Sequence, residues 1–411
     1  KASGSFVPVM TEAVHGSEAY FFSEEEQAIL KQMQTSGEDD IYRLMNRRDV
    51  ARPSLLIHQL IGRKKLKDKL PFLQHVPDYY LPDSIHTEQC SSEYSARYKA
   101  SLFQGGLFID LSAGMGIDAT FLSGSFRSGI LVEPNRTLAG ITSHNLYIMH
   151  RTNLAMAAGM GAEEFLNTFH EPADLIYIDP SRRAKDGKKT HALSDCEPDV
   201  LRLLPSLFRS SGQILIKTSP LLDIRKTILD LGPVKKVHVL GTGSECRELL
   251  FELQEAYTQP ATIAVVFTDQ SLTPVLQFTL QEEEEAPVIY SPPQNFLYEP
   301  HPAVMKAGSF QLLSKLFGVQ KLHGNTHLYT SALHCQHFPG RQFQILASCR
   351  ADRRSLQQLI PDLKAHLTVR NFPASVQELQ KKLGLRTGGD DYVFACTLAD
   401  GSKSLIHCRK V

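Results

Sequence analysis

Four short apolar runs alternate with helical stretches between residues 89 and 257, and this alternation constrains the fold more than any other feature of the sequence. The runs span residues 107–110, 129–133, 174–179 and 213–217. Nearly continuous apolar strands of this length, separated by helices, are typical of a parallel sheet that is covered on both faces. We therefore expect an α/β fold with a Rossmann-like, doubly wound sheet, whose ligands bind at the carboxyl ends of the strands.

Two more strand-like runs follow the four parallel ones. Residues 236–240 and 248–253 flank the sequence Gly-Thr-Gly-Ser and predict an antiparallel hairpin that closes the sheet. Upstream, residues 1–88 have the pattern of a helical N-terminal domain, in which Ser23 and Glu26 have the spacing of a capping box. These patterns predict a Rossmann-like domain over residues 89–280, preceded by a helical domain.

The last part of the chain has a different pattern, and a run of consecutive glutamates separates it from the sheet. Residues 286–330 predict a small domain with one helix over 303–317. Residues 331–411 predict a β-α-β-β domain. Its helix is expected to begin at Ser375, and Asp400-Gly401 predicts a hairpin. A chain of 411 residues is long enough for four domains of these sizes.

Composition places the chain among globular proteins and leaves its partners open. Lys and Arg total 44 residues, and so do Asp and Glu, so a nucleic-acid surface would have to come from local segregation of charge. None of the seven cysteines forms a Cys-x-x-Cys pair, which argues for a reducing compartment and against a zinc ribbon. No apolar run approaches the ~20 residues needed to cross a bilayer. We expect a cytoplasmic protein with no metal site and no membrane contact.

The segment between the first strand and the next helix carries the strongest functional signal. Asp110 ends the strand, and a turn with two glycines, Gly114 and Gly116, precedes the helix. Glycine lets the backbone approach a ligand closely, and a helix start presents free N–H groups. Glu133 ends the next strand, where a carboxylate can accept two hydrogen bonds from a ribose diol. The pattern predicts a nucleoside ligand across the strand ends.

Two nucleoside cofactors compete for this site, a dinucleotide and S-adenosylmethionine. A dinucleotide site usually reads Gly-x-Gly-x-x-Gly, which brings a pyrophosphate onto the helix N-terminus. Here the third glycine position is Ala119, and Asp118 would lie near the phosphates. Asp110 is unfavourable beside a pyrophosphate but favourable beside the ammonium group of S-adenosylmethionine. The Asp-x-x-Ala-Gly-x-Gly pattern resembles motif I of class I methyltransferases, and the sequence around Glu133 resembles their second acidic motif.

The fourth strand ends in Asp179-Pro180-Ser181-Arg182-Arg183. In class I methyltransferases this position lies beside the transferred methyl group and often reads Asp/Asn-Pro-Pro-Tyr/Phe. Methyl transfer is an in-line displacement, so the protein chiefly positions and desolvates the reactants. Asp179 could accept a proton or a hydrogen bond from an acceptor nitrogen. Arg182 and Arg183 could bind a phosphate, and the alternative is that they form a surface ion-pair patch.

Longer stretches resemble a family of bacterial class I methyltransferases with a C-terminal THUMP-like domain. The segments that carry the resemblance are residues 88–100, 178–183, 195–199, 216–224, 368–373 and 388–395. Residues 296–301 and 327–331 are similar to the small ferredoxin-like piece that precedes the terminal domain. The resemblance covers most of the chain from about residue 88 onward. It implies S-adenosylmethionine as the cofactor and, through the THUMP-like domain, RNA as a partner.

One departure from the class I pattern concerns the adenine of the cofactor. The third strand of these enzymes usually ends near an Asp that contacts the adenine amino group, and Gly161 stands there in this chain. Glu163 is expected on the following helix and is a poor substitute. Either another group contacts the adenine, or cofactor binding is weakened.

Several other polar residues have simpler interpretations. Lys217 ends a strand beside the site, where it could contact the substrate or could pair with Asp223, and we favour the structural pairing. The basic run at residues 63–67 is expected to be a solvated helix face, because interleaved aromatic residues are missing. Residues 89–99 could cap the cofactor site or could form an ordinary helix at the sheet edge. Basic residues over 370–386 offer a modest footprint for RNA.

Together, these features predict an S-adenosylmethionine-dependent methyltransferase that acts on a nitrogen of an RNA nucleobase, in tRNA or rRNA. The expected cofactor-binding residues are Asp110, Ser112, Ala113, Gly114, Gly116, Asp118, Glu133, Pro134, Asn135 and Asp179. The expected catalytic residues are Asp179, Arg182 and Arg183. Their motif lacks an aromatic residue to stack a base, and it lacks a cysteine nucleophile. The alternatives are a small-molecule methyltransferase and a non-catalytic RNA-binding protein with a decayed cofactor site.

Overall fold

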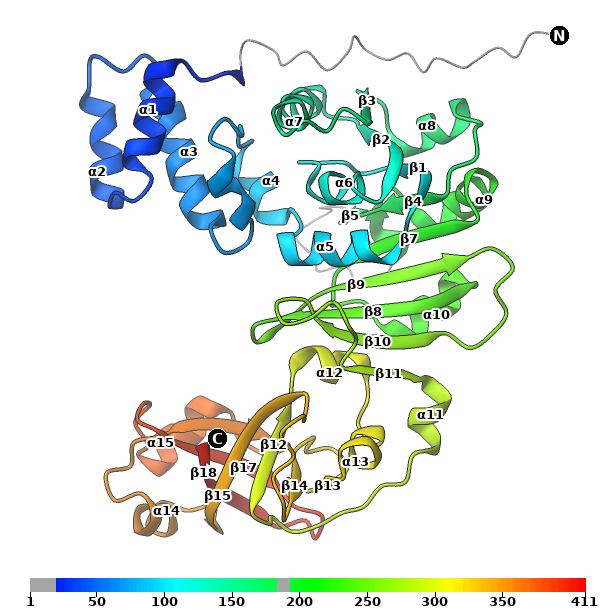
Figure 1. Cartoon of the computed structure of the whole chain (residues 1–411). Helices are drawn as coiled ribbons and strands as arrows, with labels where there is room; N and C mark the ends of the chain where they lie inside the picture. Colours follow the sequence, from blue (N-terminus) through cyan, green and yellow to red (C-terminus); the bar gives the residue numbers. More distant parts are fainter. Residues whose placement is uncertain (1–19, 183–192) are drawn as a thin grey trace, which may run out of the picture. The chain divides into compact units, whose positions relative to one another are not determined.

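A computed structural model of the chain describes residues 20–182 and 193–411. The contacts within it define two units, whose elements are labelled in Figure 1. The first unit comprises residues up to 237 together with 248–259 and 268–272. The second comprises residues 238–247, 260–267 and 273–411. The predicted division into four domains is a finer one, and it stays a prediction.

Helices form the beginning of the first unit, as the sequence predicts. They are α1 (Glu24–Met33), α2 (Glu38–Tyr42), α3 (Pro53–Leu66), α4 (Ser84–Gln89) and α5 (Glu93–Leu102), with 3-10 turns at Arg43–Asn46 and Pro71–His75. The predicted capping box is present, because the Glu26 amide donates to Ser23 Oγ (3.2 Å) and the Ser23 amide donates to the Glu26 carboxylate (2.9 Å). Leu44, Leu56 and Leu60 are among the buried residues that form a core between the helices.

Arg63 shows that the interpretation of residues 63–67 as a solvated face is wrong in part. Its guanidinium donates hydrogen bonds to the carbonyls of Pro77 (2.7 Å) and Tyr79 (2.6 Å), in the irregular segment that follows α3. Burial lowers the pKa of Arg63 to about 10. The reason is that carbonyls outside regular secondary structure need donors, and Arg63 supplies them. Lys65 and Lys67 are exposed, as predicted.

Seven strands of one sheet have the order β8-β9-β7-β4-β1-β2-β3. These strands are β1 (Gly105–Asp110), β2 (Phe126–Glu133), β3 (Leu154–Ala158), β4 (Leu175–Ile178), β7 (Gln213–Thr218), β8 (Val234–Thr242) and β9 (Glu245–Gln254). Neighbours among β1, β2, β3, β4 and β7 pair in parallel, and β9 runs antiparallel to β7. This order confirms the predicted α/β sheet and its closing hairpin.

Helices alternate with the parallel strands and account for their continuous apolar runs. They are α6 (Ile117–Leu122), α7 (Arg136–Ile148), α8 (Ala162–Thr168), α9 (Val200–Ser210) and α10 (Ile224–Leu231). Phe108, Ile176 and Ile214 lie in three neighbouring strands and have no exposed surface. Strands buried on both faces have no solvent side on which polar residues would alternate.

The second unit contains two antiparallel strands and a larger sheet. β10 (Thr262–Phe267) pairs with β11 (Leu276–Thr279), and α11 (Leu280–Glu285) follows. The larger sheet has the order β13-β14-β12-β15-β18-β17-β16. Its strands are β12 (Phe296–Pro300), β13 (Gln320–Lys321), β14 (Tyr329–Ser331), β15 (Gly340–Arg350), β16 (His366–Arg370), β17 (Asp391–Thr397) and β18 (Lys403–Lys410). Its helices are α12 (Pro302–Ala307), α13 (Leu312–Phe317), α14 (Arg353–Leu359) and α15 (Val376–Leu383). The predicted hairpin at Asp400-Gly401 joins β17 to β18 and is confirmed.

The single helix predicted over residues 303–317 is wrong, because two short helices, α12 and α13, occupy this range. Gly308 follows α12 with a φ of 79° and takes the chain out of the helical conformation. The Glu283 carboxylate then accepts the amides of Phe310 (2.9 Å) and Gln311 (2.7 Å). It also accepts the amide of Leu312 (2.9 Å). The distant Glu283 carboxylate therefore accepts the hydrogen bonds of amides that would have bonded to helix carbonyls if the helix had continued.

No helix among residues 20–182 and 193–411 is both long and apolar enough to cross a membrane. Within the same residues, no group of three or more His, Cys, Asp or Glu side chains is arranged to hold a metal ion.

Candidate active site

The loop between β1 and α6 has the geometry that its two glycines predict. Gly114 and Gly116 have φ values of 52° and 70°, which side chains disfavour. A Cβ atom on Gly116 would lie 2.8 Å from Cγ2 of Thr142, so α7 also leaves no room for one. The Thr142 hydroxyl donates to the Gly114 carbonyl (2.6 Å), and the Ala113 amide donates to the Val132 carbonyl (3.1 Å). The loop is thus fixed against α7 and β2.

Glu133, at the end of β2, joins this loop to the next one. Its carboxylate accepts the Gly114 amide at Oε2 and the Asn135 amide at Oε1, each at 2.9 Å. Asn135 in turn caps α7 by accepting the amides of Thr137 and Leu138, so Pro134 lies in a tight turn between two fixed residues. The structure therefore brings together Gly114, Glu133 and Asn135, as the sequence predicts for the cofactor site.

Asp110 and Ser112 form the other side of the loop. The amide of Ser112 donates to Asp110 Oδ1 (2.9 Å), and its hydroxyl lies 3.3 Å from the same oxygen. Burial raises the pKa of Asp110 to about 7, despite the hydrogen bonds from Ser112, and the nearby Asp118 and Asp179 add to the rise. The carboxylate is thus desolvated without a compensating charge, and an ammonium group of a ligand would provide that charge.

Asp179 lies beside this loop, immediately after β4. Its amide donates to the Ser112 hydroxyl oxygen (2.6 Å), so one serine connects the strand ends of β1 and β4. The Asp179 carboxylate forms an ion pair with Lys217 at the end of β7. The predicted pairing of Lys217 with Asp223 is therefore wrong. Asp223 instead accepts the amide of Lys226 (2.8 Å) and caps α10, which is the local use of an Asp before a helix.

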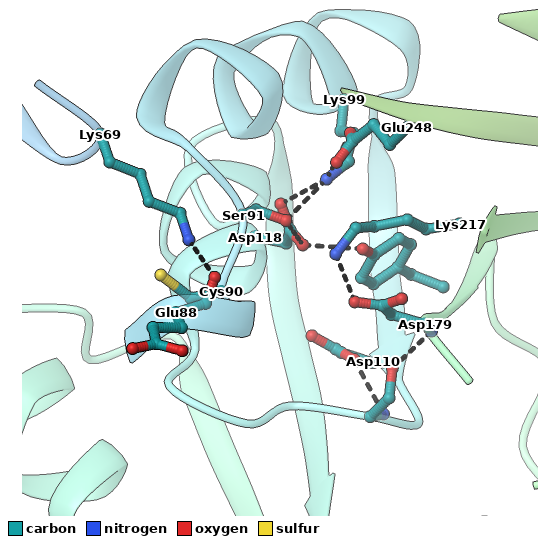
Figure 2. A network of polar contacts seen from close by, with 12 residues as sticks. Lys69, Glu88, Cys90, Ser91, Lys99, Asp110, Asp118, Asp179, Lys217 and Glu248 are labelled. Atoms are coloured by element: carbon teal, nitrogen blue, oxygen red, sulfur yellow. Dashed lines mark hydrogen bonds and ion pairs between the residues drawn. The ribbon is translucent and has the colours of Figure 1, made fainter. Parts of the chain in front are cut away.

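Asp118 is the residue where several buried polar groups converge (Figure 2). It accepts hydrogen bonds from the hydroxyls of Ser91 and Tyr177, both at 2.7 Å, and from Lys99 Nζ at 2.9 Å. Lys99 also lies 3.0 Å from Glu248 Oε1, an electrostatic contact rather than an aligned hydrogen bond. We call Lys99, Asp118, Asp179, Lys217 and Glu248 the buried charge cluster.

The positive and negative side chains of this cluster stabilise one another in their ionised forms. Burial opposes ionisation of Asp118, but Lys99 and Lys217 outweigh it and hold the pKa of Asp118 below its usual value. Lys99 pairs with Asp118 and Glu248, and Lys217 pairs with Asp179, so each carboxylate of the cluster has a lysine partner. The desolvated carboxylate of Asp110 is instead the one that fits the ammonium group of S-adenosylmethionine.

The sequence did not identify Lys99, Tyr177, Ser91 or Glu248 as site residues. Lys99 and Ser91 lie in the segment 88–100 that carried the family resemblance, and that signal pointed to the segment without giving its role. Of the two interpretations left open for residues 89–99, the structure gives a helix, α5, that directs Lys99 toward the motif I helix. Glu248 carried no local signal, since it is one polar residue in an apolar strand.

Cys90 lies near the cluster, as Figure 2 shows, and its surroundings keep the thiol unreactive. Its thiol is directed at the Thr87 carbonyl (3.2 Å), and burial raises its pKa. A thiol held in its neutral form is a poor nucleophile. This agrees with the absence of cysteine from the motif at Asp179.

The two arginines predicted as catalytic are described only in small part. Ser181–Arg182 form a short strand, β5, that pairs with β6 (Cys196–Glu197). The side chain of Arg182 and the whole of Arg183 lie outside the described residues. Their predicted contact with the acceptor therefore stays a prediction.

Near the end of the third strand, the structure has Gly161 at the position where the sequence comparison with class I methyltransferases expects an Asp. β3 ends at Ala158, and Gly161 is the residue before α8. Glu163 lies on α8, where it pairs with the exposed side chain of Arg202 (2.5 Å). The Glu163 carboxylate is thus paired on the surface of α8. Within the described residues, the loop between β3 and α8 contains no carboxylate that could contact the adenine.

Comparison with known proteins agrees with this architecture. Residues 296–339 match a ferredoxin-like domain family, and residues 340–410 match a family described as THUMP domain-like. A crystal structure described as a "putative methyltransferase from Porphyromonas gingivalis W83" is 30% identical and has a TM-score of 0.81, over 95% of this chain and 100% of that one. A search of curated proteins gave no match.

Shorter solved structures are similar to part of the chain. An rRNA methylase from Streptococcus thermophilus is 16% identical over 39% of this chain and 93% of its own, with a TM-score of 0.29. TrmK of M. capricolum, in complex with S-adenosylhomocysteine, is 12% identical over 40% of this chain and 70% of its own, with a TM-score of 0.32. Scores this low do not bear on the activity of this chain. The full-length likeness does establish kinship: the chain belongs to the family of bacterial proteins with a class I methyltransferase fold and C-terminal ferredoxin-like and THUMP-like domains.

Proposed function

We propose that this protein is an S-adenosylmethionine-dependent methyltransferase that acts on RNA, in tRNA or rRNA. The observation that carries the proposal is the connected set of strand-end groups in which Glu133 holds Gly114 and Ser112 joins Asp110 to Asp179. The bound cofactor would supply a methyl group activated by a sulfonium centre. The remaining contributions come from the chain itself.

Each strand-end group has a role that follows from its position. Glu133 would accept hydrogen bonds from the ribose diol while its loop contacts hold it in place. Asp110 would face the ammonium group, and the Gly114–Gly116 turn would let the backbone approach the ligand. Asp179, on the neighbouring strand end, would face the acceptor. Asp118 is better explained as a residue that fixes the loop, because its oxygens already receive Ser91, Lys99 and Tyr177.

Support for RNA comes from the terminal domain. Residues 340–410 match the THUMP-like family, and fold analogy of this kind raises the expectation of RNA binding. Lys381, Lys382 and Arg386 are exposed and could contact phosphates. The acceptor atom predicted from the sequence, a nucleobase nitrogen, stays a prediction.

The direct experiment is methyl transfer from methyl-labelled S-adenosylmethionine to separate tRNA and rRNA fractions. Label in RNA that depends on the wild-type protein and is lost with Glu133→Ala supports the proposal. A matched control is Lys235→Met, which removes a lysine whose ion pair with Glu252 lies on β8 and β9, and it should retain activity.

Two other outcomes would each favour an alternative. Cofactor turnover with small molecules but never with RNA would indicate a small-molecule methyltransferase. RNA binding without any cofactor binding would indicate a non-catalytic RNA-binding protein.

A further inference from the structure

Asp179 and Lys217 are the members of the buried charge cluster that an acceptor can reach. They directly follow Ile178 and Ile216, which are paired in adjacent strands, so both side chains lie at the same edge of the sheet. The side chain of Asp179 is 33% exposed, those of Lys217 and Asp118 are 11% and 10% exposed, and Lys99 has no exposed surface. Asp179 is therefore the open end of the cluster, and its ion pair keeps Lys217 directly beside it.

The lasting positive charge of Lys217 discriminates between acceptor atoms. Burial alone would lower the pKa of Lys217, but the carboxylates of Asp179, Glu248 and Asp118 raise it above its usual value. A nitrogen acceptor gains positive charge as its lone pair attacks a methyl group, and a neighbouring ammonium group opposes that change. A hydroxyl oxygen that is losing its proton gains negative charge, which the same ammonium group stabilises.

The residues after Asp179 favour the same class of acceptor. Pro180 and Ser181 follow it, so the motif has no aromatic ring to hold a nucleobase flat beside the methyl group. A base that is modified in this way is usually taken out of its stack and held between apolar or aromatic side chains. A ribose hydroxyl is carried on the backbone of the RNA and needs no such support.

We propose, as a refinement that rests on the proposed function, that the acceptor is a hydroxyl oxygen, the 2′-hydroxyl of a ribose in RNA, with Asp179 and Lys217 as the catalytic residues. The oxygen forms a bond to the methyl carbon while the carbon–sulfur bond breaks, and that electron pair goes to sulfur, which leaves as a neutral thioether. The Asp179 carboxylate takes the hydroxyl proton while the oxygen attacks, so that the oxygen gains negative charge before its bond to carbon is complete, and later releases the proton to water. Lys217 donates a hydrogen bond to the reacting oxygen and stabilises its developing negative charge.

Lys99 and Glu248 act through these two residues and are positioning residues. Lys99 lies 2.9 Å from Asp118 and 3.0 Å from Glu248, so it holds both acids in the cluster from within the protein. Glu248 and Asp118 in turn keep Lys217 positively charged. Lys99 pairs with Glu248 in the closed interior and Lys217 pairs with Asp179 at the open end (Figure 2), and the carboxylates of Glu248 and Asp118 act on Lys217 through their charge.

The position of the transferred methyl group tests the proposal. The full-length protein would be incubated with methyl-labelled S-adenosylmethionine and with RNA from cells that lack the gene, and the RNA would then be hydrolysed in alkali. A 2′-O-methyl group blocks cleavage at its own nucleotide, so the expected result is label in alkali-resistant dinucleotides. Label in base-methylated mononucleotides would overturn the proposal and leave RNA methyl transfer standing. No label in any RNA would overturn both the proposal and the proposed function.

Substitution of Lys217 tests its role with a second readout. We expect Lys217→Met to lower kcat by about 10²–10³-fold, the range for loss of one preorganised donor. Binding of S-adenosylhomocysteine, measured by titration calorimetry, should stay near the wild-type value, because Lys217 acts on the acceptor. The matched control Lys235→Met should leave both readouts unchanged. Wild-type kcat in a folded, cofactor-binding Lys217→Met protein would contradict the assignment.

The pH dependence of the rate tests Glu248 as a positioning residue. The groups that face Lys217 are Asp179, Glu248 and Asp118, with the neutral thiol of Cys90 nearby. Glu248→Gln removes one of the anions that raise the pKa of Lys217, so the alkaline loss of activity should begin at lower pH. A purely structural role of Glu248 would lower the stability of the protein but leave the pH profile in place.

Discussion

Each of the two units contains buried acids that pair with positively charged side chains. The partner is a lysine in the first unit and a pair of arginines in the second. In the second unit, Glu299 pairs with Arg341 and Arg370, whose side chains remain 46% and 45% exposed. In the first unit, Asp118 and Glu248 pair with Lys99, which has no exposed surface. We call Glu299, Arg341 and Arg370 the arginine cluster.

The difference separates a structural arrangement from a functional one. A buried acid that only has to be neutralised can use arginines whose charge stays partly in water, and such pairs cost little desolvation free energy. A lysine that is itself removed from water carries a large desolvation cost, which the fold has to offset. Such arrangements concentrate at functional sites, and this one has its open end at Asp179, beside the loop between β1 and α6.

The largest effect should come from Lys99→Met. It leaves Asp118 and Glu248 buried without their shared cation, and loss of one partner of a buried pair typically costs about 3–5 kcal/mol. Urea denaturation would measure the free energy of unfolding. The control Lys235→Met, on a partly exposed pair, should lose at most about 1 kcal/mol. A Lys99→Met protein as stable as that control would erase the distinction between the two clusters.

The next largest effect should come from removing both arginines of the second cluster. Arg341→Met or Arg370→Met alone should lower the free energy of unfolding by about 0.2–1 kcal/mol, because the other arginine still neutralises Glu299. The double variant leaves Glu299 buried and unpaired, so its loss should exceed the sum of the single losses by about 0.5–3 kcal/mol. An additive double-mutant cycle would show that the two arginines do not share the acid.

A third prediction concerns Asp110, a buried acid held by hydrogen bonds from Ser112 rather than by an ion pair. Its pKa of about 7 means that its carboxylate becomes protonated as the pH falls through neutrality. Affinity for a cofactor with an ammonium group should then fall by about tenfold between pH 8 and pH 6. Calorimetry at both values would measure it, and Asp110→Asn should bind weakly with little pH dependence. A pH dependence that persists unchanged in Asp110→Asn would assign the titration to another group.

The same group affects stability with the opposite sign. The folded protein holds the Asp110 proton more tightly than the unfolded chain does, so this contribution to stability is present at acidic pH and is lost as the pH rises to about 7. The pH at which the wild-type and Asp110→Asn unfolding curves diverge would measure it. Cofactor binding should reverse the loss by providing a positive partner.

The smallest effect should come from Glu163→Ala. Its carboxylate, on the surface of α8, pairs with the exposed Arg202 of α9, so its removal should leave both stability and cofactor affinity close to the wild type. A large loss of affinity, measured by the same calorimetry, would instead show that Glu163 turns toward the adenine when the cofactor binds.

Local patterns in the sequence predicted the parallel sheet and the glycine turn between β1 and α6 well. A continuous apolar run is a direct consequence of burial on both faces, and a backbone conformation with positive φ favours glycine, so β1 and Gly116 could be predicted one segment at a time. The sequence also placed Glu133 at the end of the next strand, and because adjacent parallel strands place their carboxyl ends side by side, the structure brings it against Gly114.

The charge cluster could not be predicted in this way. Lys99, Lys217 and Glu248 come from α5, β7 and β9, and only the assembled sheet brings them together. From the sequence alone, Lys217 is expected to form an ion pair with Asp223, whereas in the structure Asp223 caps α10. The break between α12 and α13 has the same origin, because the distant Glu283 provides its acceptors.

Titration calorimetry with S-adenosylmethionine and S-adenosylhomocysteine, for the wild-type protein and Glu133→Ala, tests the central claim most directly. The account predicts micromolar binding to the wild type that is lost in a folded Glu133→Ala protein, because Glu133 holds both the ligand and the Gly114 loop. No binding to folded wild-type protein at millimolar cofactor would contradict the methyltransferase assignment and leave an RNA-binding protein with an inactive site.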